Sequence, residues 1–192
     1  MATAAPATSI PEACRAARRA ARTLATLDTA VKDSALRAIA DALIERTPEI
    51  LAANELDVAA GREADIGDAL LDRLRLDLAR IADIASAVTK VAALPDPVGE
   101  VIEGRRLPNG LDVRKVRVPL GVIAVVYEAR PNVTIDAAAL CLKAGNAILL
   151  RGSSIAAHSN AVLAAIAAET AVASGLPAGC VTLIAGGGRD EL

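Results

Sequence analysis

The chain has 192 residues, 54% of them hydrophobic, and a formal net charge of −2. This length and composition support a buried core in one domain, or one and a half, and argue against a largely disordered chain. One Tyr, no Phe and no Trp are present, so the core must be aliphatic. The low net charge, with basic residues that alternate with acids, excludes a basic surface for nucleic acid.

The sequence contains no recognisable targeting or metal-binding motif. No apolar run approaches the length of a membrane span, and residues 1–10 lack the charged start and apolar block of a secretion signal. The three cysteines, Cys14, Cys141 and Cys180, are odd in number, far apart and without metal-ligand spacing. We therefore expect a cytoplasmic protein that binds neither membrane nor metal, with Cys141 and Cys180 as small buried hydrophobes.

The first 94 residues are predicted to form a helical region. Pro11 suits the first turn of an Ala- and Arg-rich helix over residues 11–27, and Asp28 is a candidate cap for the next helix. The apolar stripe of that second helix has three- and four-residue spacing and consists of Leu36, Ile39, Leu43 and Ile44.

Three further helices are predicted before residue 95. Thr47 fits the N-cap and Pro48 the first position of a third helix, which Gly61 is expected to end. A short helix over residues 68–74 follows. The last one ends before Pro95, and its apolar stripe consists of Ile81, Ile84, Val88 and Val91.

Residues 95–118 are predicted to form a β-hairpin. Strand-like segments over 98–106 and 111–118 flank Pro108-Asn109-Gly110. Asn-Gly between two such segments is a strong signal for a tight turn, because both residues tolerate a positive φ.

Residues 119–192 predict a β-α-β-α-β unit. The expected strands and helices, in chain order, are 122–127, 133–144 (ended by Gly145), 147–151, 155–173 and 181–185. The first two strands are continuous aliphatic runs, as parallel strands covered on both faces should be. The fold class is therefore α/β: amino-terminal helices, a hairpin, and half of a doubly wound, Rossmann-like parallel sheet that is incomplete and leaves an open edge.

Two loops at the carboxyl ends of the predicted strands carry polar groups, and ligands bind at this end of open α/β sheets. Tyr127, Glu128, Arg130 and Asn132 follow the first strand, and Arg151-Gly152-Ser153-Ser154 follows the second. A helix start and an arginine both favour an anion, but either serine can also serve as a simple helix cap.

The run from residue 119 to residue 152 resembles gamma-glutamyl phosphate reductase, a family of the aldehyde dehydrogenase superfamily. The resemblance is carried by Tyr127-Glu128-Ala129-Arg130-Pro131-Asn132 and by residues 136–152, with support from residues 70–74 and 96–99. It covers most of residues 28–185. Ordinary aldehyde dehydrogenases carry a different loop at this place, which argues against a relative acting on another acyl group.

This resemblance implies an enzyme of proline biosynthesis. The family reduces L-glutamate 5-phosphate to L-glutamate 5-semialdehyde and phosphate with NADPH, through a cysteine nucleophile. Family members are much longer, and their cysteine lies downstream of Leu192. We therefore expect the full-length protein to be this oxidoreductase, and the isolated chain to be inactive.

The resemblance also implies roles for the loop residues. Asn132 is the expected oxyanion donor, although Arg130 could take the same place, and substrate binding is expected from Glu128, Arg130 and Asn132. Glu128 would meet the substrate's ammonium group or simply pair with Arg130. Binding of NADPH is expected from Tyr127, Arg151, Gly152, Ser153 and Ser154. The hairpin belongs to a region of homo-oligomerisation in that superfamily.

The sequence also fits a non-catalytic function. A truncated homologue could use the helices, the hairpin and the open sheet edge to bind a partner subunit or a nucleotide. The motif Gly186-Gly187-Gly188-Arg189 is not a dinucleotide fingerprint because no helix follows it, and His158 is expected on a polar helix face.

Overall fold

The structure, a computed structural model, describes residues 9–185, so the predicted Gly186–Arg189 motif lies outside the described residues. Within this range the elements are, in chain order, α1 (Ile10–Leu24), α2 (Thr29–Glu45), α3 (Thr47–Glu63), α4 (Asp68–Leu74), α5 (Leu78–Ala93), β1 (Val101–Arg106), β2 (Asp112–Val116), β3 (Val122–Val126), α6 (Asn132–Lys143), β4 (Ala147–Arg151), the 3-10 helix η1 (Ser154–Ala156), α7 (Ala157–Ala173) and β5 (Val181–Leu183).

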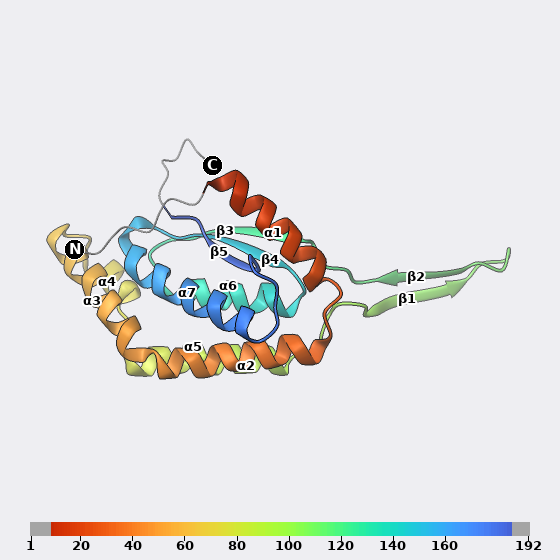
Figure 1. Ribbon diagram of the computed structural model, residues 1–192, viewed down its shortest axis with the longest axis horizontal. Coiled ribbons are helices and arrows are strands. Elements are labelled where there is room, and N and C mark those ends of the chain that lie inside the picture. Colours follow the sequence, from red (N-terminus) through yellow and green to blue (C-terminus); the bar gives the residue numbers. More distant parts are fainter. Residues whose placement is uncertain (1–8, 186–192) are drawn as a thin grey trace.

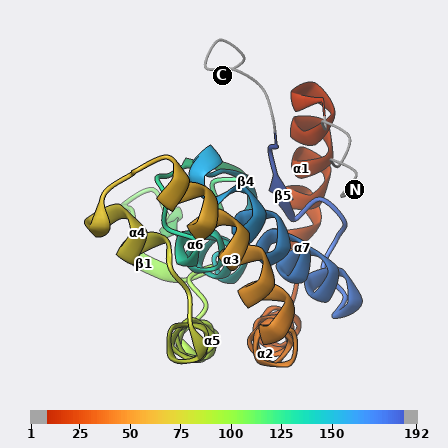
Figure 2. The ribbon, with the colours of Figure 1, turned by 90° about the vertical axis from the view of Figure 1, so that its left-hand side faces the viewer.

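These elements are stacked in layers around a small parallel sheet (Figure 1). Helix α1 covers one face of the sheet, α6 and α7 cover the other, and α2 and α5 lie beyond α6 and α7. Helices α3 and α4 lie at the end where the strands have their carboxyl ends, which faces the viewer in Figure 2. The hairpin β1–β2 projects from the opposite end, away from the layers. The predicted α/β class is confirmed.

The sheet has the strand order β3-β4-β5, with both pairs parallel. Its register runs from Val122 opposite Ala147 to Val126 opposite Arg151. Strand β4 is central and buried, as predicted. Strand β3 is only partly buried, because Ala124 and Val126 on one of its faces are exposed, and Val126 is 67% exposed. The prediction that β3 is covered on both faces is therefore wrong for this chain.

One aliphatic core joins the amino-terminal helices to the sheet. It draws on α1, α2, α5, α6, β4 and α7, so the segments on either side of the hairpin share it. The predicted boundaries between three regions, at residues 94 and 118, therefore stay a prediction. The helical region and the sheet region share one core. The largest fully buried apolar residues are Leu24, Leu36, Leu43, Ile50, Leu74, Ile81, Ile135, Leu142, Ile148, Leu150 and Leu163.

Two predicted helix ends differ from the structure. Helix α3 already includes Thr47, and Arg46 stands at the cap position. The Thr47 hydroxyl donates to the Leu43 carbonyl at 3.1 Å, so it continues the preceding helix and does not cap the next one. Gly61 lies inside α3, where a Cβ would come within 2.9 Å of Ile66 Cδ1. Gly61 therefore leaves room for the Ile66 side chain to pack against α3, and it does not end the helix.

The second helix is close to its prediction. Asp28 stands at the cap position of α2 with extended backbone, but its side chain makes no capping hydrogen bond. Leu36, Ile39 and Leu43 are buried as expected, whereas the Ile44 side chain is 51% exposed and does not belong to the core stripe.

The hairpin is confirmed, with shorter strands than predicted. Strands β1 and β2 pair antiparallel, and every residue in them is exposed. At the turn, Gly110 donates its backbone N–H to the Leu107 carbonyl at 2.9 Å and has a φ of +87°, a value that favours glycine.

One segment is more apolar than the sequence analysis allowed. Residues 154–173 form a 20-residue helical stretch that is long and apolar enough, by length and composition, to cross a membrane. The expectation that no run approaches this length is therefore wrong. In the structure the stretch packs against α2, α3, α6 and β5, as a core helix does.

Two buried lysines fix the end of the molecule from which the hairpin leaves. The Lys32 ammonium group of α2 is fully buried and lies 2.5 Å from Asp96 Oδ2. Asp96 also accepts hydrogen bonds from the Thr29 hydroxyl and the Val98 backbone N–H, at 2.7 and 2.9 Å. Lys143 of α6 donates to Asp33 of α2 and, at 2.8 Å, to the Ala92 carbonyl of α5.

The partners of Asp96 make its charge stabilising. Burial alone would raise the pKa of Asp96, but the hydrogen bonds from Lys32, Thr29 and Val98 outweigh it and hold the pKa below its ordinary value. A carboxyl group whose pKa falls on folding stabilises the protein above its unfolded pKa, about 3.9, and loses this contribution as the pH falls through the folded pKa.

Replacing Asp96 by Ala should lower the free energy of unfolding by roughly 3–5 kcal/mol at pH 7, because it leaves the buried Lys32 charge without its partner. The gap between wild type and variant should narrow below about pH 4. Urea unfolding at several pH values measures both effects. Asp41→Ala, at an exposed position of α2, the helix that carries Lys32, should change stability by less than about 0.5 kcal/mol. An equal loss in both variants would contradict this.

Candidate active site

The two predicted loops meet at the carboxyl ends of β3 and β4, where the Tyr127 backbone N–H donates to the Arg151 carbonyl at 3.1 Å. They line two different hollows. Arg130 and Asn132 line one, and the segment from Arg151 to Ser154 lines the other. Tyr127 and Glu128 line neither. The sequence therefore placed two groups of residues at one sheet edge, and the structure separates them into two sites.

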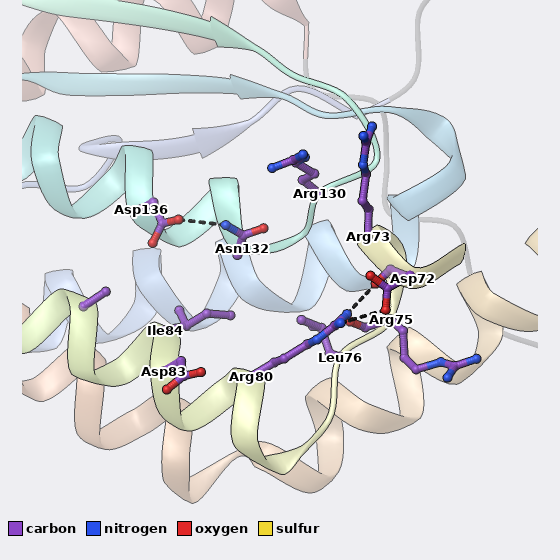
Figure 3. A pocket seen from close by; sticks show the side chains of 11 residues that line it. Asp72, Arg73, Arg75, Leu76, Arg80, Asp83, Ile84, Arg130, Asn132 and Asp136 are labelled. Atoms are coloured by element: carbon purple, nitrogen blue, oxygen red, sulfur yellow. Dashed lines mark hydrogen bonds and ion pairs between the residues drawn. The ribbon is translucent and has the colours of Figure 1, made fainter. Parts of the chain in front are cut away.

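The larger hollow, here called the arginine-lined cavity, has a volume of about 390 Å³ (Figure 3). It lies between α4, α5 and the start of α6. Its lining residues are Asp72, Arg73, Arg75, Leu76, Arg80, Asp83, Ile84, Ala87, Arg130, Asn132 and Asp136. A cavity of this size and polarity is within the range of small-molecule sites.

One of the four arginines builds the wall of this cavity. Arg80 donates to Asp72 Oδ1 at 2.8 Å, to the Asp72 carbonyl, and to the Arg75 carbonyl at 2.7 Å. The fork of its guanidinium group thus holds the connection between α4 and α5, as the dashed lines in Figure 3 show. The guanidinium group of Arg80 therefore has a structural role and is not free to bind a ligand.

Arg73 and Arg130 are available for a ligand. Arg73 comes from α4 and Arg130 from the loop after β3, and Figure 3 shows both beside the opening between these elements. Among residues 9–185 neither guanidinium group takes part in an ion pair. Two unneutralised guanidinium groups suit a carboxylate or phosphate ligand, which each can bind through two N–H groups.

Asn132 begins α6 and is held by a neighbour one turn later. Its side-chain amide donates to Asp136 Oδ2 at 2.9 Å. Burial raises the pKa of Asp136, and the hydrogen bond from Asn132 offsets this only in part. The second N–H of the amide forms no hydrogen bond within the described residues.

Glu128 is exposed and does not reach the arginine-lined cavity. Its carbonyl accepts the Arg130 backbone N–H at 2.8 Å, but no ion pair joins the two side chains within the described residues. The pairing of Glu128 with Arg130 that the sequence suggested is therefore not formed within the described residues.

The second hollow, here called the Arg151 pocket, has a volume of about 200 Å³ and opens at the carboxyl ends of β4 and β5. Ser153 stands at the cap position of η1, and its hydroxyl accepts the Ile155 backbone N–H at 3.3 Å. Ser153 therefore caps η1, as the sequence suggested. Because its hydroxyl oxygen accepts this bond, the hydroxyl proton can still be donated to a ligand. The pocket is lined by Arg151, Gly152, Ser153, Ser154, Ala157, Asn160, Ala161, Leu183, Ile184 and Ala185.

Gly152 is required by the protein itself. A Cβ at this position would lie 2.2 Å from Asn160 Nδ2 and 3.0 Å from Tyr127 Cζ. Asn160 is 2% exposed, so it has no room to move away. The missing side chain thus lets the loop pack against Asn160 and Tyr127.

Tyr127 packs against Gly152 in the wall of the Arg151 pocket. Its hydroxyl lies 2.7 Å from Thr134 Oγ1, which itself donates to Asn160 Oδ1 at 3.0 Å. Tyr127 is therefore the donor in the first bond. Burial raises the pKa of Tyr127. The hydroxyl is committed to a buried chain of hydrogen bonds and does not face a ligand.

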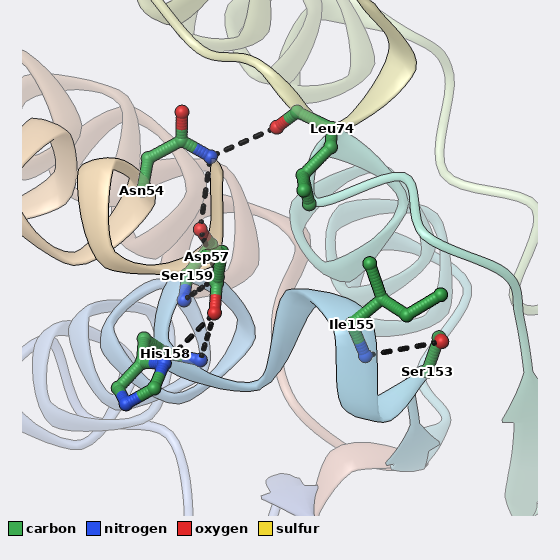
Figure 4. Close-up of polar contacts among 7 residues, drawn as sticks. All are labelled: Asn54, Asp57, Leu74, Ser153, Ile155, His158 and Ser159. Carbon is green, nitrogen blue, oxygen red and sulfur yellow. Dashed lines mark hydrogen bonds and ion pairs between the residues drawn. The ribbon is translucent and has the colours of Figure 1, made fainter. Parts of the chain in front are cut away.

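A buried carboxylate that the sequence analysis missed holds the start of α7 (Figure 4). Asp57 of α3 is 2% exposed and accepts four hydrogen bonds from two consecutive residues. His158 donates its backbone N–H at 3.1 Å and pairs through Nδ1 at 2.8 Å. Ser159 donates its backbone N–H at 2.8 Å and its hydroxyl at 2.6 Å. The exposed His158 ring, expected on a polar face, is thus tied to α3.

Asn54, one turn earlier on α3, connects this network to the other site. Its amide group donates to the Leu74 carbonyl at 2.8 Å and lies 3.0 Å from Ser159 Oγ, and its carbonyl accepts the Leu76 backbone N–H at 2.7 Å. Leu76 lines the arginine-lined cavity. The wall of that cavity and the first turn of α7 are therefore fixed by neighbouring side chains of one helix.

Comparison with known proteins gives the family. The sequence profile of the aldehyde dehydrogenase family matches residues 1–191. The chain belongs to the aldehyde dehydrogenase family. A gamma-glutamyl phosphate reductase of Thermobifida fusca is 55% identical over 176 residues, which cover 92% of this chain and 42% of that protein. The resemblance inferred from residues 119–152 is confirmed.

Two solved structures agree with this family assignment. Gamma-glutamyl phosphate reductase from Thermotoga maritima superposes with a TM-score of 0.92 at 39% identity, over 95% of this chain and 44% of that chain. The protein of the same name from Saccharomyces cerevisiae gives 0.90 at 33% identity, over 96% and 48%. The chain thus spans less than half the length of these relatives.

No cysteine of this aldehyde dehydrogenase chain lines either site among the described residues. Burial raises the pKa of both Cys141 and Cys180 to about 11, so their thiols are protonated at neutral pH. Cys14 is half-buried on α1. These positions support the prediction that none of the three is the nucleophile.

The site residues that sequence reasoning missed come from distant segments. Arg73 lies in residues 70–74, which carry part of the resemblance but had no predicted role. Asn54 and Asp57 are three residues apart on α3, on the same face as the buried Ile50 and Ala53. Two polar residues on an apolar helix face are a usable signal for a buried hydrogen-bond network.

Gly152→Ala should destabilise the protein by about 1–3 kcal/mol, because its Cβ overlaps the buried Asn160 amide. Denaturant unfolding measures the loss. Gly104→Ala is the matched control, since a Cβ there meets nothing closer than 3.9 Å. Adding Asn160→Ala to Gly152→Ala should recover part of the loss caused by the overlap. A Gly152→Ala protein as stable as the control variant would show that the overlap is not present in solution.

Asp57→Ala should lower the free energy of unfolding by roughly 2–3 kcal/mol, because it leaves the buried backbone N–H and hydroxyl of Ser159 without an acceptor. Hydrogen exchange should also be faster in the first turn of α7 than in wild type. Glu55→Ala, at an exposed position of the same helix, should change neither quantity. Unchanged exchange in Asp57→Ala would contradict the role of this carboxylate as the anchor of α7.

Proposed function

We propose that the protein containing this chain reduces L-glutamate 5-phosphate to L-glutamate 5-semialdehyde and phosphate, with NADPH as the reductant. The arginine-lined cavity is the observation that carries the proposal. It presents Arg73 and Arg130, which form no ion pair within residues 9–185, beside an amide donor at the sheet edge where this fold binds ligands. Relatives named gamma-glutamyl phosphate reductase support it, at 51–55% identity.

The proposed substrate matches the groups in this cavity. It carries a carboxylate and an acyl phosphate, and two guanidinium groups can hold both through paired hydrogen bonds. Asn132 would donate its second amide N–H to the oxygen of the reacting carbonyl as negative charge develops there. Arg130 lines the same cavity and would then act on the phosphate or the carboxylate.

The Arg151 pocket fits part of a nicotinamide dinucleotide. Its volume of about 200 Å³ is below the common range for whole ligands, so it can take only one end of such a molecule. Arg151 and the hydroxyl groups of Ser153 and Ser154 suit a phosphorylated ribose. Bound there, the coenzyme would supply a hydride. Gly152 and Tyr127 shape this pocket from within the protein.

The proposed reaction also needs a thiolate, and residues 9–185 bring no cysteine to either site. The chain would therefore contribute the substrate wall and part of the coenzyme site of a larger cytoplasmic enzyme. The exposed hairpin supports homo-oligomer formation, and its outward residues include Val101, Ile102, Val113 and Val116.

A second function follows from the same exposed surface. The hairpin and the unpaired side of β3 leave apolar side chains uncovered, including Val126 and, at the end of the hairpin, Val118 and Leu120. A non-catalytic homologue would use this surface to bind a partner subunit. Co-purification of the 192-residue chain with a larger homologous subunit, without reductase activity in the complex, would favour this function.

Reductase assays on the full-length protein test the main proposal. Arg151→Gln should raise the KM for NADPH about 10- to 100-fold and change that for NADH much less, because only NADPH carries the 2′-phosphate that the guanidinium group would hold. Arg37→Gln, at an exposed position of α2 that lines neither site, is the control. Equal changes for both coenzymes would place Arg151 away from the 2′-phosphate. Absence of acyl-phosphate reduction in wild type would refute the function.

The isolated 192-residue chain should show no turnover in the same assay. Turnover that disappears when Cys14, Cys141 or Cys180 is replaced by Ala would overturn this expectation, because it would identify a nucleophile within the chain.

A further inference from the structure

Three carboxylates line the arginine-lined cavity, and they differ in what they already contact. Asp72 is neutralised by Arg80, whose Nη2 lies 2.8 Å from Asp72 Oδ1. Asp83 is an exposed residue of α5, open to water. Asp136, on the second turn of α6, is half-buried beside Asn132. A charge removed from water interacts more strongly with a ligand than an exposed one, so Asp136 is the carboxylate best placed to bind a cation.

Asp136 has no positive partner in the described part of the chain. Its one hydrogen bond comes from the neutral Asn132 amide, at 2.9 Å, and no lysine, arginine or histidine of residues 9–185 forms an ion pair with it. Burying a carboxylate without a counter-ion is costly, and a cationic group in the cavity would relieve this cost. Figure 3 shows Asp136 and Asn132 side by side along α6.

The cavity therefore presents charged groups of both signs. Arg73 and Arg130 offer two sites for anionic groups, and Asp136 offers one site for a cationic group. A ligand with two anionic ends and one ammonium group fits this pattern. Glu128, which the sequence suggested for the ammonium group, is exposed and lies outside the lining.

We propose that Asp136, and not Glu128, recognises the α-ammonium group of the substrate, while Arg73 and Arg130 hold its anionic groups. This assignment rests on the proposed function, which supplies an amino-acid acyl phosphate as the substrate class. Asp136 then discriminates between substrates with and without the amino group, and Arg73 becomes a substrate-binding residue contributed by α4.

Asp136 could instead serve only to orient Asn132, and two variants separate these roles. Asp136→Asn removes the charge but keeps an oxygen that accepts the Asn132 N–H. Asp136→Leu removes both the charge and the acceptor. A recognition role requires that the Asn variant already loses the discrimination, whereas an orienting role requires that the Asn variant keeps it.

L-glutamate and glutarate are the probes, because they carry the same two carboxylates and differ only in the α-ammonium group. Their binding to the purified full-length protein is measured by calorimetry. Wild type should prefer L-glutamate by about tenfold or more, the size expected of a charge-assisted hydrogen bond. Asp136→Asn should abolish this preference and change glutarate binding less than about threefold. Arg73→Gln and Arg130→Gln should weaken both ligands together.

The control variants are Glu128→Gln and Asp83→Asn, which should keep the preference. A preference that survives in Asp136→Asn, or that disappears in Glu128→Gln, overturns the assignment. Equal weakening of both ligands in Asp136→Asn overturns it as well, because it indicates a structural effect on the cavity. Failure of wild type to bind either ligand, or to distinguish between them, has the same consequence.

Reductase assays on the same preparations distinguish this assignment from the proposed function. If wild type reduces L-glutamate 5-phosphate but the preference does not depend on Asp136, the assignment alone fails. If the preference depends on Asp136 but no acyl phosphate is reduced, the function fails while the recognition of an amino acid stands.

Discussion

The carboxylate of Asp57 holds the first turn of α7 against α3, and both candidate sites depend on this contact. It accepts hydrogen bonds from His158 and Ser159, and Asn54 extends the same network to the Leu76 backbone. One helix face thus fixes the start of α7, behind the Arg151 pocket, and the wall of the arginine-lined cavity. Buried polar networks of this kind are costly when incomplete, so the relative position of the two sites is tightly specified.

The same contact limits how the Arg151 pocket can bind an anion. A free helix start attracts phosphate through its unpaired backbone N–H groups. At α7 the N–H groups of His158 and Ser159 already donate to Asp57, which also places a negative charge there. Anion binding must then come mainly from Arg151 and from the serine hydroxyls of η1. The pocket therefore resembles a side-chain site more than the glycine-rich cradle of a dinucleotide fold.

Sequence patterns predicted the elements of this fold well and their surroundings less well. The stripe of Ile81, Ile84 and Val88 and the Asn109-Gly110 turn are local signals, and both were correct. The exposure of β3 and the place of Gly61 depend on which segments pack nearby, which no local pattern contains. In the same way, Arg130 and Asn132 were found from one loop, but Arg73 and Asp57 reach the sites from segments 50 to 100 residues away.

The charges of the described chain fall into two groups with different physical roles. At the hairpin end, Lys32 and Lys143 are buried and paired with Asp96 and Asp33, so their contribution is to the stability and position of the elements. At the opposite end, Arg73, Arg130 and Asp136 face a cavity without ionic partners among residues 9–185. Asp136 is half-buried, so its unpaired charge costs stability, whereas Arg73 and Arg130 are exposed and stay hydrated until a ligand binds. The end of the molecule whose charges lack ionic partners among residues 9–185 is therefore the end to which we assign the substrate in the proposed function.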